Sequence, residues 1–151
     1  MIDTVEEHDF RVRAAVYDGV MSSGTIPTVE DLTRRLARSR EEVQASLERL
    51  AAAKALVLQR DSREVLMANP FSAVPTPFAV LANDHLYYGN CIWDALGIPA
   101  MLHTDGRIES SCGCCGESMQ LFVAAGDLQP VDGVVHFAIP AARWWQDIVY
   151  N

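Results

Sequence analysis

Three prolines within eight positions divide this chain of 151 residues. They are Pro70, Pro75 and Pro77. Proline fixes its own backbone angle, lacks an N–H donor and restricts the residue before it, so no regular helix passes through such a segment. We therefore predict an extended proline-rich crossover over residues 69–77, which separates an N-terminal unit at 1–68 from a second unit at 78–151.

The first unit has the pattern of three helices followed by a hairpin. Apolar residues recur at helical spacing over residues 5–20. Two further helix starts are predicted at Thr28 and Ser39, because each is followed three positions later by an acidic residue that completes a capping box. Residues 55–67 then alternate apolar and polar side chains, as a short hairpin does. This order predicts a winged-helix-like unit.

The second unit mixes one helix with short strands. The helix is expected over Cys91–Leu102, interrupted near Gly97 and Pro99. The strands are expected where β-branched and aromatic residues stand between turn-forming residues, at 78–82, 85–88, 107–110, 119–123 and 134–139. The whole chain is therefore predicted to be α+β, with a winged-helix-like three-helix unit followed by a small mixed or antiparallel sheet with flanking helices.

The charge balance excludes several classes of partner. The formal net charge is −8 and the isoelectric point is near 4.8, whereas a nucleic-acid interface normally carries a basic footprint. We expect no nucleic-acid partner and no membrane partner, since no apolar run approaches the roughly 18 residues that span a bilayer. The acidic N-terminus has no apolar signal-peptide core, and we expect a cytoplasmic protein.

All four cysteines lie in one short stretch and favour soft-metal chemistry. Cys91 is followed by Asp94 one helical turn later, and Cys112, Cys114 and Cys115 come about twenty residues further on. In a reducing compartment, clustered cysteines more often bind metal or react than form disulfides. Thiolates select soft ions, and a carboxyl group beside a thiol is able to hold or deliver a proton. A helix start at Cys91 is expected to favour its thiolate.

The cysteine cluster also permits other interpretations. Cys112 and Cys115 form a Cys-x-x-Cys pair in a glycine-punctuated turn, which would supply half of a tetrahedral zinc site with Cys91 or a histidine completing it. A matching second Cys-x-x-Cys pair is missing. A thioredoxin-like role is disfavoured, because the pair does not stand between a strand and a helix of a βαβ unit. The tryptophans are expected to pack in the core, or else to line an apolar pocket, at Trp93, Trp144 and Trp145.

Three stretches of the second unit together resemble the core of the organomercurial (alkylmercury) lyase family. They are YYGNCIWDAL at Tyr87–Leu96, IPA at Ile98–Ala100 and RIESSC at Arg107–Cys112. In that family an aromatic strand leads to a Cys-x-x-Asp helix start, an apolar Pro-Ala step follows, and an Arg-x-x-Ser-x-Cys strand comes next. The helical first unit and the proline-rich crossover match the family's layout as well, so that the resemblance covers most of the chain.

The resemblance implies mercury resistance by protonolysis of a carbon–mercury bond, which gives a hydrocarbon and a bound mercuric ion. Cys91 would capture the organomercurial as a thiolate, and Asp94 would manage the proton that ends on the leaving carbon. The implied partners are a small organomercurial substrate and small thiols, with no cofactor required. Cys112 matches a family cysteine that looks mainly structural.

The chain departs from the family pattern in its C-terminal segment. Family members carry a second catalytic cysteine there, whereas residues 141–151 contain none. Cys114 or Cys115 would have to replace it as the second thiolate. The chain stops within an apolar stretch, which is expected of a sequence that ends before its gene product does.

A non-catalytic role is the competing interpretation. In it, Cys91, Cys112, Cys114 and Cys115 bind or sense a soft metal ion such as mercury or zinc, and the first unit reads out the binding. The two hypotheses differ over Asp94, which a lyase needs and a binding protein does not. The sequence leaves the oligomeric state, the preferred organic group and the identity of the second thiol open.

Overall fold

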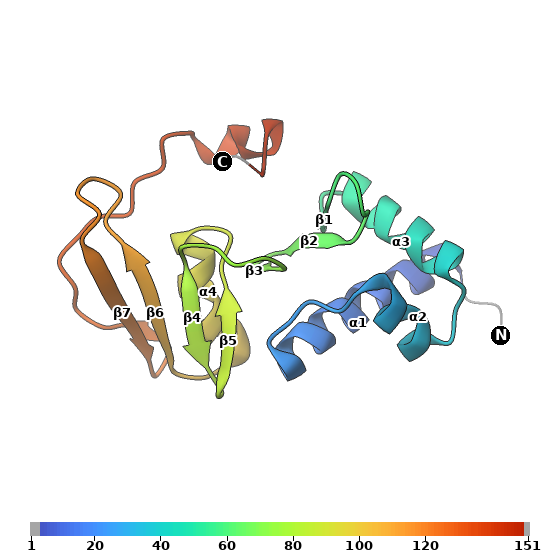
Figure 1. Ribbon diagram of the computed structural model, residues 1–151, viewed down its shortest axis with the longest axis horizontal. Coiled ribbons are helices and arrows are strands. Elements are labelled where there is room, and N and C mark those ends of the chain that lie inside the picture. Colours follow the sequence, from blue (N-terminus) through green and yellow to red (C-terminus); the bar gives the residue numbers. More distant parts are fainter. Residues whose placement is uncertain (1–3, 150–151) are drawn as a thin grey trace.

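The computed structural model describes residues 4–149, and it contains a helical half and a sheet half joined by short strands (Figure 1). Residues 1–3 and 150–151, which belong to the two predicted units, lie outside the described residues. The helical half and its small sheet comprise α1 Val5–Ser23, α2 Val29–Leu36, α3 Arg40–Ala52, β1 Val57–Leu58, β2 Val65–Ala68 and β3 Phe71–Ser72. The other half comprises β4 Ala79–Ala82, β5 His85–Tyr88, α4 Ile92–Leu102, β6 Gly106–Ser111, β7 Ser118–Ala124, β8 Asp127–Leu128 and the 3-10 helix η1 Ala141–Gln146.

The helix starts of the first half follow from their caps, as predicted. Thr28 and Ser39 each accept a hydrogen bond from the backbone N–H three residues on, and the acidic residue at that position bonds back to the cap. These reciprocal bonds satisfy backbone donors that a helix start otherwise leaves free. α1 has a third capping box at Thr4 and ends at Gly24, whose φ of 78° is the left-handed conformation that glycine adopts readily.

The proline-rich crossover is more ordered than an extended linker. Within it, β3 pairs antiparallel with β2 and so completes a three-stranded sheet in the order β1-β2-β3. A turn at Asn69-Pro70, whose peptide bond is cis, reverses the chain between the two strands. Phe71 is buried and also bridges to Gly89 at the end of β5. The crossover therefore fixes the start of the second half against the first.

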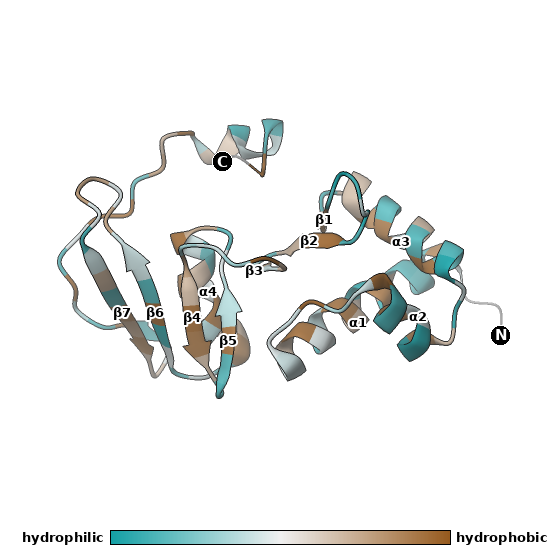
Figure 2. Cartoon of the chain, viewed as in Figure 1, coloured by the Kyte–Doolittle hydropathy of each residue, from teal (hydrophilic) through white to brown (hydrophobic). Residues whose placement is uncertain are grey.

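The second half is an antiparallel sheet of five strands in the order β5-β4-β6-β7-β8, which confirms the predicted α+β class. One face of this sheet is buried beneath α4, with Val80, Tyr87, Ile108 and Leu121 pointing inward. Side chains that alternate with these along each strand point to the opposite face of the sheet, which is more exposed. Figure 2 shows the hydrophobic colouring concentrated on β4 and the adjoining part of α4.

Two predictions for the second half are wrong. α4 runs without a break through Gly97 and Pro99, and residues 134–139 form no strand. Pro99 is buried, and its ring fits against Gly106, where a side chain's Cβ would come within 2.4 Å of the ring. This packing offsets the backbone hydrogen bond that proline cannot make.

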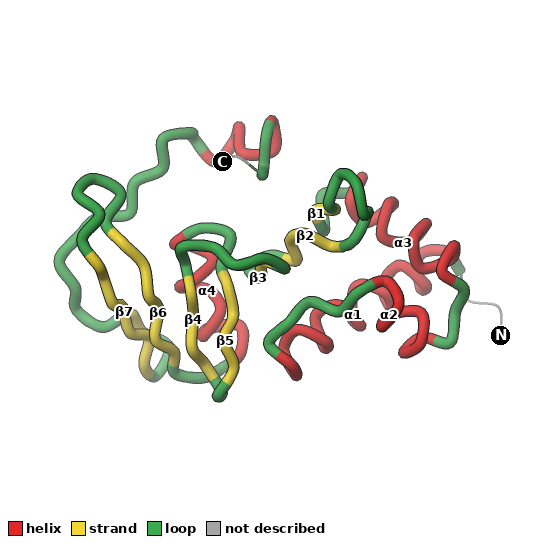
Figure 3. Tube along the Cα trace, viewed as in Figure 1, coloured by secondary structure: helices red, strands yellow, loops and turns green. Residues whose placement is uncertain are grey.

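The segment at 134–139 does not pair with β7. That edge of β7 pairs instead with the short β8, a strand that the sequence analysis did not predict. Val134 is 93% exposed, so the apolar residues on which the strand prediction for 134–139 rested do not mark a buried strand. The chain instead runs as a loop from β8 to η1 (Figure 3).

α1 belongs to both hydrophobic cores. Val12 and Val16 pack with α2 and α3 in the first core, whereas Val20, one turn further along, packs with the sheet and α4 in the second. Tyr87 on β5 donates a hydrogen bond to the carbonyl of Met21, near the end of α1 (3.2 Å). The two halves therefore share one helix. None of the helices in the described part of the chain combines the length and apolar character needed to cross a bilayer.

Candidate active site

Cys91 stands at the point where β5 gives way to α4. It is the N-cap residue of α4, with an extended backbone, and its carbonyl accepts the first helical bond from the N–H of Ala95 (3.0 Å). Gly89 makes this tight connection possible, because a Cβ at that position would lie 2.6 Å from the backbone nitrogen of Ala95. The sulfur is free and half-buried. The turn thus holds the thiol at the helix start.

Asp94 lies in the first turn of α4, beside the thiol. The Asp94 carboxyl group is half-buried and lies close enough to the Cys91 thiol that each group shifts the pKa of the other. Asn90 donates a hydrogen bond from Nδ2 to Oδ2 of Asp94 (3.1 Å). The structure therefore brings together the two residues that the sequence singled out.

Asn90 connects this pair to the crossover, and sequence reasoning missed it. Its Nδ2 also donates to Oδ1 of Asn69 (3.1 Å), while its own Oδ1 is buried and has no hydrogen-bond partner. An amide so placed fixes Asp94 relative to the residues before β3. Its position directly before Cys91 was the available signal, but the sequence gives no indication that its side chain turns toward Asp94.

Burial governs the proton equilibria of the pair. It raises the pKa of the Cys91 thiol above 9.0, and this outweighs the opposing effect of the N–H groups of Asp94 and Trp93 near the sulfur. Those N–H groups form no cap hydrogen bond of standard geometry to the sulfur. The expectation that the helix start favours a thiolate is therefore wrong for the free protein. Burial also raises the pKa of Asp94, against the lowering effect of the hydrogen bonds from Asn90.

The other three cysteines form a separate turn at the tip of the β6–β7 hairpin. Cys112 directly follows β6 and is partly exposed, whereas Cys114 and Cys115 are exposed. Backbone N–H groups of Cys115 and Cys114 donate to the Cys112 sulfur and lower the pKa of its thiol. Within residues 4–149, no group of three or more His, Cys, Asp or Glu side chains is arranged to hold a metal ion.

The hairpin turn and Cys91 leave the sheet at the same end. Tyr88 of β5, Ala79 of β4 and Glu109 of β6 lie in one row across the sheet, and Cys91 and Cys112 each come three residues after that row. Because β4 separates β5 from β6, the two chain segments are two strand spacings apart, about 10 Å. The turn therefore lies near Cys91 but not beside it.

The tryptophans do not fill the core as expected. Trp93 is 65% exposed, although it stands between Cys91 and Asp94 in the sequence. Trp144 donates from its indole N–H to the carbonyl of Ile139 (2.8 Å) and packs against Phe137, and Trp145 lies 5.7 Å from the ammonium group of Lys54. The rings of Trp144 and Trp145 therefore stabilise the C-terminal loop and its contact with the turn after α3 rather than the sheet core.

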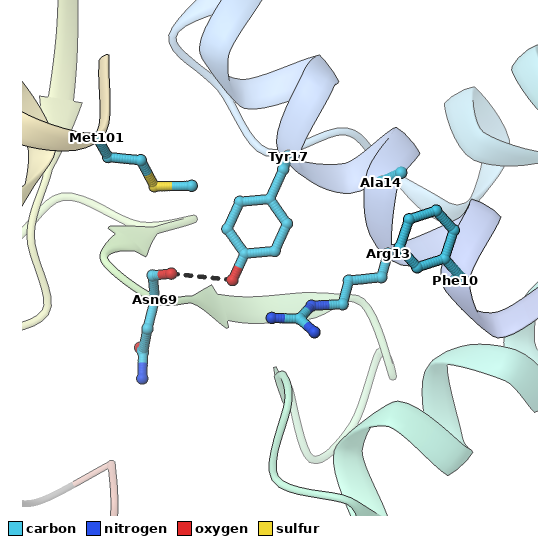
Figure 4. Close-up of a pocket in the computed structure, with 6 residues that line it drawn as sticks. All are labelled: Phe10, Arg13, Ala14, Tyr17, Asn69 and Met101. Carbon is cyan, nitrogen blue, oxygen red and sulfur yellow. Dashed lines mark hydrogen bonds between the residues drawn. The ribbon is translucent and has the colours of Figure 1, made fainter. Parts of the chain in front are cut away.

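A shallow pocket of about 270 Å³ opens beside the site, between α1 and α4. Figure 4 shows Tyr17 pointing across it to bond the carbonyl of Asn69 (2.9 Å), with Arg13 and Met101 on its walls. Burial raises the pKa of Tyr17, and the charge of Asp94 adds to the rise. Neither Cys91 nor Asp94 lines this pocket; Tyr17 and Asn69 connect it to the site.

Comparisons with known proteins show which family the chain resembles. A family model described as "Alkylmercury lyase" matches residues 71–150, which begin at β3 and include α4 and the β6–β7 hairpin. Two proteins named alkylmercury lyase, from Bacillus cereus and Clostridium butyricum, are each 25% identical to the chain over 124 residues. These alignments cover 80% of this chain and 55% of each relative, so the chain spans about half the length of those proteins.

The fold is also similar to a solved structure. The mercury-bound form of MerB2 superposes with a TM-score of 0.63 and 22% identity, over 82% of this chain and 59% of that one. The likeness extends beyond residues 71–150, because so large a share of the chain must include part of the helical half.

Proposed function

Because the chain belongs to the alkylmercury lyase family, we propose that it cleaves carbon–mercury bonds by protonolysis, with Cys91 as the capturing thiol and Asp94 as the proton carrier. The observation that carries this proposal is the juxtaposition of the Cys91 thiol and the Asp94 carboxyl group, both half-buried, at the start of α4. The substrate class is a small organomercurial, the products are a hydrocarbon and protein-bound mercury, and no cofactor is needed.

The first step replaces a sulfur–hydrogen bond with a sulfur–mercury bond. As the Cys91 sulfur attacks mercury, its proton passes to the neighbouring Asp94 carboxylate. Burial supports this order, since it raises the pKa of Asp94 and makes the carboxylate a better base. The thiol proton is thereby kept within the site instead of being lost to solvent.

The second step returns that proton to carbon. Sulfur donation to mercury increases electron density on the attached carbon, and the protonated Asp94 delivers its proton there as the carbon–mercury bond breaks. The overall balance is one organomercurial and one thiol giving one hydrocarbon and one sulfur–mercury bond. Asn90 orients the carboxyl group for both transfers through its 3.1 Å hydrogen bond.

The second sulfur on mercury has two candidate sources. Cys114 and Cys115 are candidates within the chain, but their turn would have to move across about 10 Å to reach Cys91. A small thiol bound to the mercury needs no such movement, and we propose it as the simpler source. A reducing compartment such as the cytoplasm supplies small thiols and keeps the cysteines free.

Hydrocarbon release tests the proposal directly. We expect benzene from phenylmercury, over many turnovers with excess small thiol, from the unsubstituted protein and from Cys114→Ser, which serves as the exposed-thiol control. Cys91→Ser should lose benzene release and the phenylmercury bound at position 91, whereas Asp94→Asn should retain phenylmercury at Cys91 and release little hydrocarbon. Stoichiometric mercury binding without benzene from the unsubstituted protein would refute the lyase proposal and support the binding protein instead.

A further inference from the structure

The tip of the β6–β7 hairpin carries a pair of sulfurs that the proposed cleavage does not use. The last ladder pair is Ser111 with Ser118, and six residues form the turn between them, CGCCGE at 112–117. The N–H of Cys112 donates to the carbonyl of Glu117 (2.8 Å), and the N–H of Gly116 donates back to the carbonyl of Cys112 (2.8 Å). These two bonds close the turn independently of the cysteine side chains.

Cys112 and Cys115 stand three residues apart inside this closed turn, which brings their side chains within reach of one shared ion. The backbone N–H groups of Cys115 and Cys114 and the Cys115 thiol lie close enough to the Cys112 sulfur to lower the pKa of its thiol. Two backbone donors pointed at one sulfur stabilise the negative charge that a metal-bound thiolate carries. Cys114 lies between the two residues and takes part through its backbone.

The turn has room for an ion and is open to solvent. Gly116 has a φ of 74°, the left-handed conformation that turns the chain back toward β7. A Cβ built at Gly113 or Gly116 would meet no atom within 4 Å, and both Cys114 and Cys115 are exposed. An ion therefore reaches the sulfurs without any movement of the sheet.

From this arrangement we propose that Cys112 and Cys115 form a second soft-metal site, separate from Cys91, which binds a two-coordinate thiophilic cation such as the mercuric ion. Binding replaces two thiol protons, which pass to solvent, with two sulfur–metal bonds, and no electron is transferred. Zinc normally takes four ligands, whereas this pair supplies two, so a soft ion that accepts linear sulfur coordination is the better fit. The site acts on free cation and does not depend on carbon–mercury cleavage.

Mercuric chloride titration of full-length Cys91→Ser tests the site in the absence of the proposed active-site thiol. In the presence of excess glutathione, we expect native mass spectrometry to detect one bound mercury, with sulfur–mercury charge-transfer absorption in the ultraviolet. A second substitution, Cys115→Ser or Cys112→Ser, should abolish binding of this mercury ion, whereas Cys114→Ser as the second substitution should leave it bound. Zinc chloride should give no comparable equivalent.

Two results would overturn the site. The first is that the Cys91→Ser variant and the double variant with Cys91→Ser and Cys115→Ser retain equal amounts of mercury. The second is that glutathione removes all of the mercury from the Cys91→Ser variant. Alkylation mapping of the unsubstituted protein provides a readout independent of variant folding, because bound mercury should protect Cys112 and Cys115 from iodoacetamide and leave Cys114 reactive. Benzene release from phenylmercury by Cys112→Ser separates this proposal from the lyase proposal, since the release should persist when the second mercury is lost.

Discussion

Replacing Gly89 with alanine should displace the start of α4 and with it the proposed active site. The added Cβ would lie 2.6 Å from the nitrogen and 2.9 Å from the Cα of Ala95, both backbone atoms. Neither side has room to yield, since Ala95 is fully buried and Gly89 donates to the carbonyl of Phe78 (2.9 Å). Thr76 also holds the Gly89 carbonyl with a 2.6 Å hydrogen bond.

The size of the effect follows from this overlap. Reaching ordinary contact at 3.4 Å from 2.6 Å requires a shift of about 0.8 Å between Gly89 and α4. Overpacking of this kind costs about 1–3 kcal/mol of unfolding free energy. A misplacement near 1 Å lowers the rate by about 10²-fold where catalysis depends on positioning. We therefore expect a moderately destabilised protein whose hydrocarbon release is almost lost.

Gly97→Ala in the same helix is the matched control. The nearest atom to its added Cβ is the Cβ of Pro70 at 4.0 Å, so nothing needs to move. Alanine in a helix interior is favoured over glycine by roughly 0.5–1 kcal/mol, and this variant should be slightly more stable than the unsubstituted protein. Urea unfolding and benzene release from phenylmercury measure both quantities. A Gly89→Ala protein with unchanged stability and unchanged release would refute the reasoning.

Three further predictions concern pH and the contacts of α1. Burial raises the pKa of Asp94 above its ordinary 3.8, so the folded state holds this proton more tightly than the unfolded state does. The stabilisation that protonated Asp94 contributes is full below pH 3.8 and is lost as the pH rises through the pKa of the folded state. Urea unfolding at several pH values should therefore show Asp94→Asn gaining stability relative to the unsubstituted protein as the pH rises. The hydrogen bond from Arg49, partly opposed by desolvation, lowers the pKa of Asp9, so its contribution is present above pH 3.8 and lost as pH falls through the folded pKa. Asp9→Asn should cost about 1 kcal/mol at neutral pH, because the paired charges are partly exposed, and the cost should shrink in acid when measured by urea unfolding. Tyr17→Phe removes the 2.9 Å hydrogen bond to the carbonyl of Asn69 and should lower the urea-unfolding free energy by about 1 kcal/mol, with benzene release retained.

The helix starts were predictable because their signals are local. At Thr28 and Ser39 the capping side chain, its acidic partner and the bonds they exchange all lie within four residues. The β4–β5 hairpin was predictable for the same reason, since Asn83-Asp84 adopts left-handed angles between two strands of matched register.

The errors came from packing and pairing between different secondary-structure elements. Pro99 continues α4 because Gly106, on the next strand, leaves space for its ring. Residues 134–139 have a strand-like pattern, but β8 occupies the edge of β7 that they would need. Composition and alternation contain neither fact, and tertiary packing overrides local preference in both places.

In the proposed active site, too, the local features were predictable from the sequence and the tertiary contacts were not. Cys91 and Asp94 were identifiable from their spacing, which places them on one helical turn. Two features of Asn90 depend on how the crossover folds back beside α4. They are its buried Oδ1, which has no hydrogen-bond partner, and the hydrogen bond that its Nδ2 donates to Asn69. The direction of the Cys91 pKa was also missed, because the sequence indicates a helix start but not that burial outweighs it.

Support for the proposed site extends into the helical half through α1. Tyr17 holds the carbonyl of Asn69, and the side chain of Asn69 in turn accepts from Asn90, which bonds to Asp94. Val20 packs in the core beneath the sheet, one turn after the residues that pack against α2 and α3. The burial that raises the pKa of both the thiol and the carboxyl group therefore depends on both halves of the chain. A site that must retain one proton until carbon can take it requires such burial, and this gives the helical half a structural role in the proposed reaction.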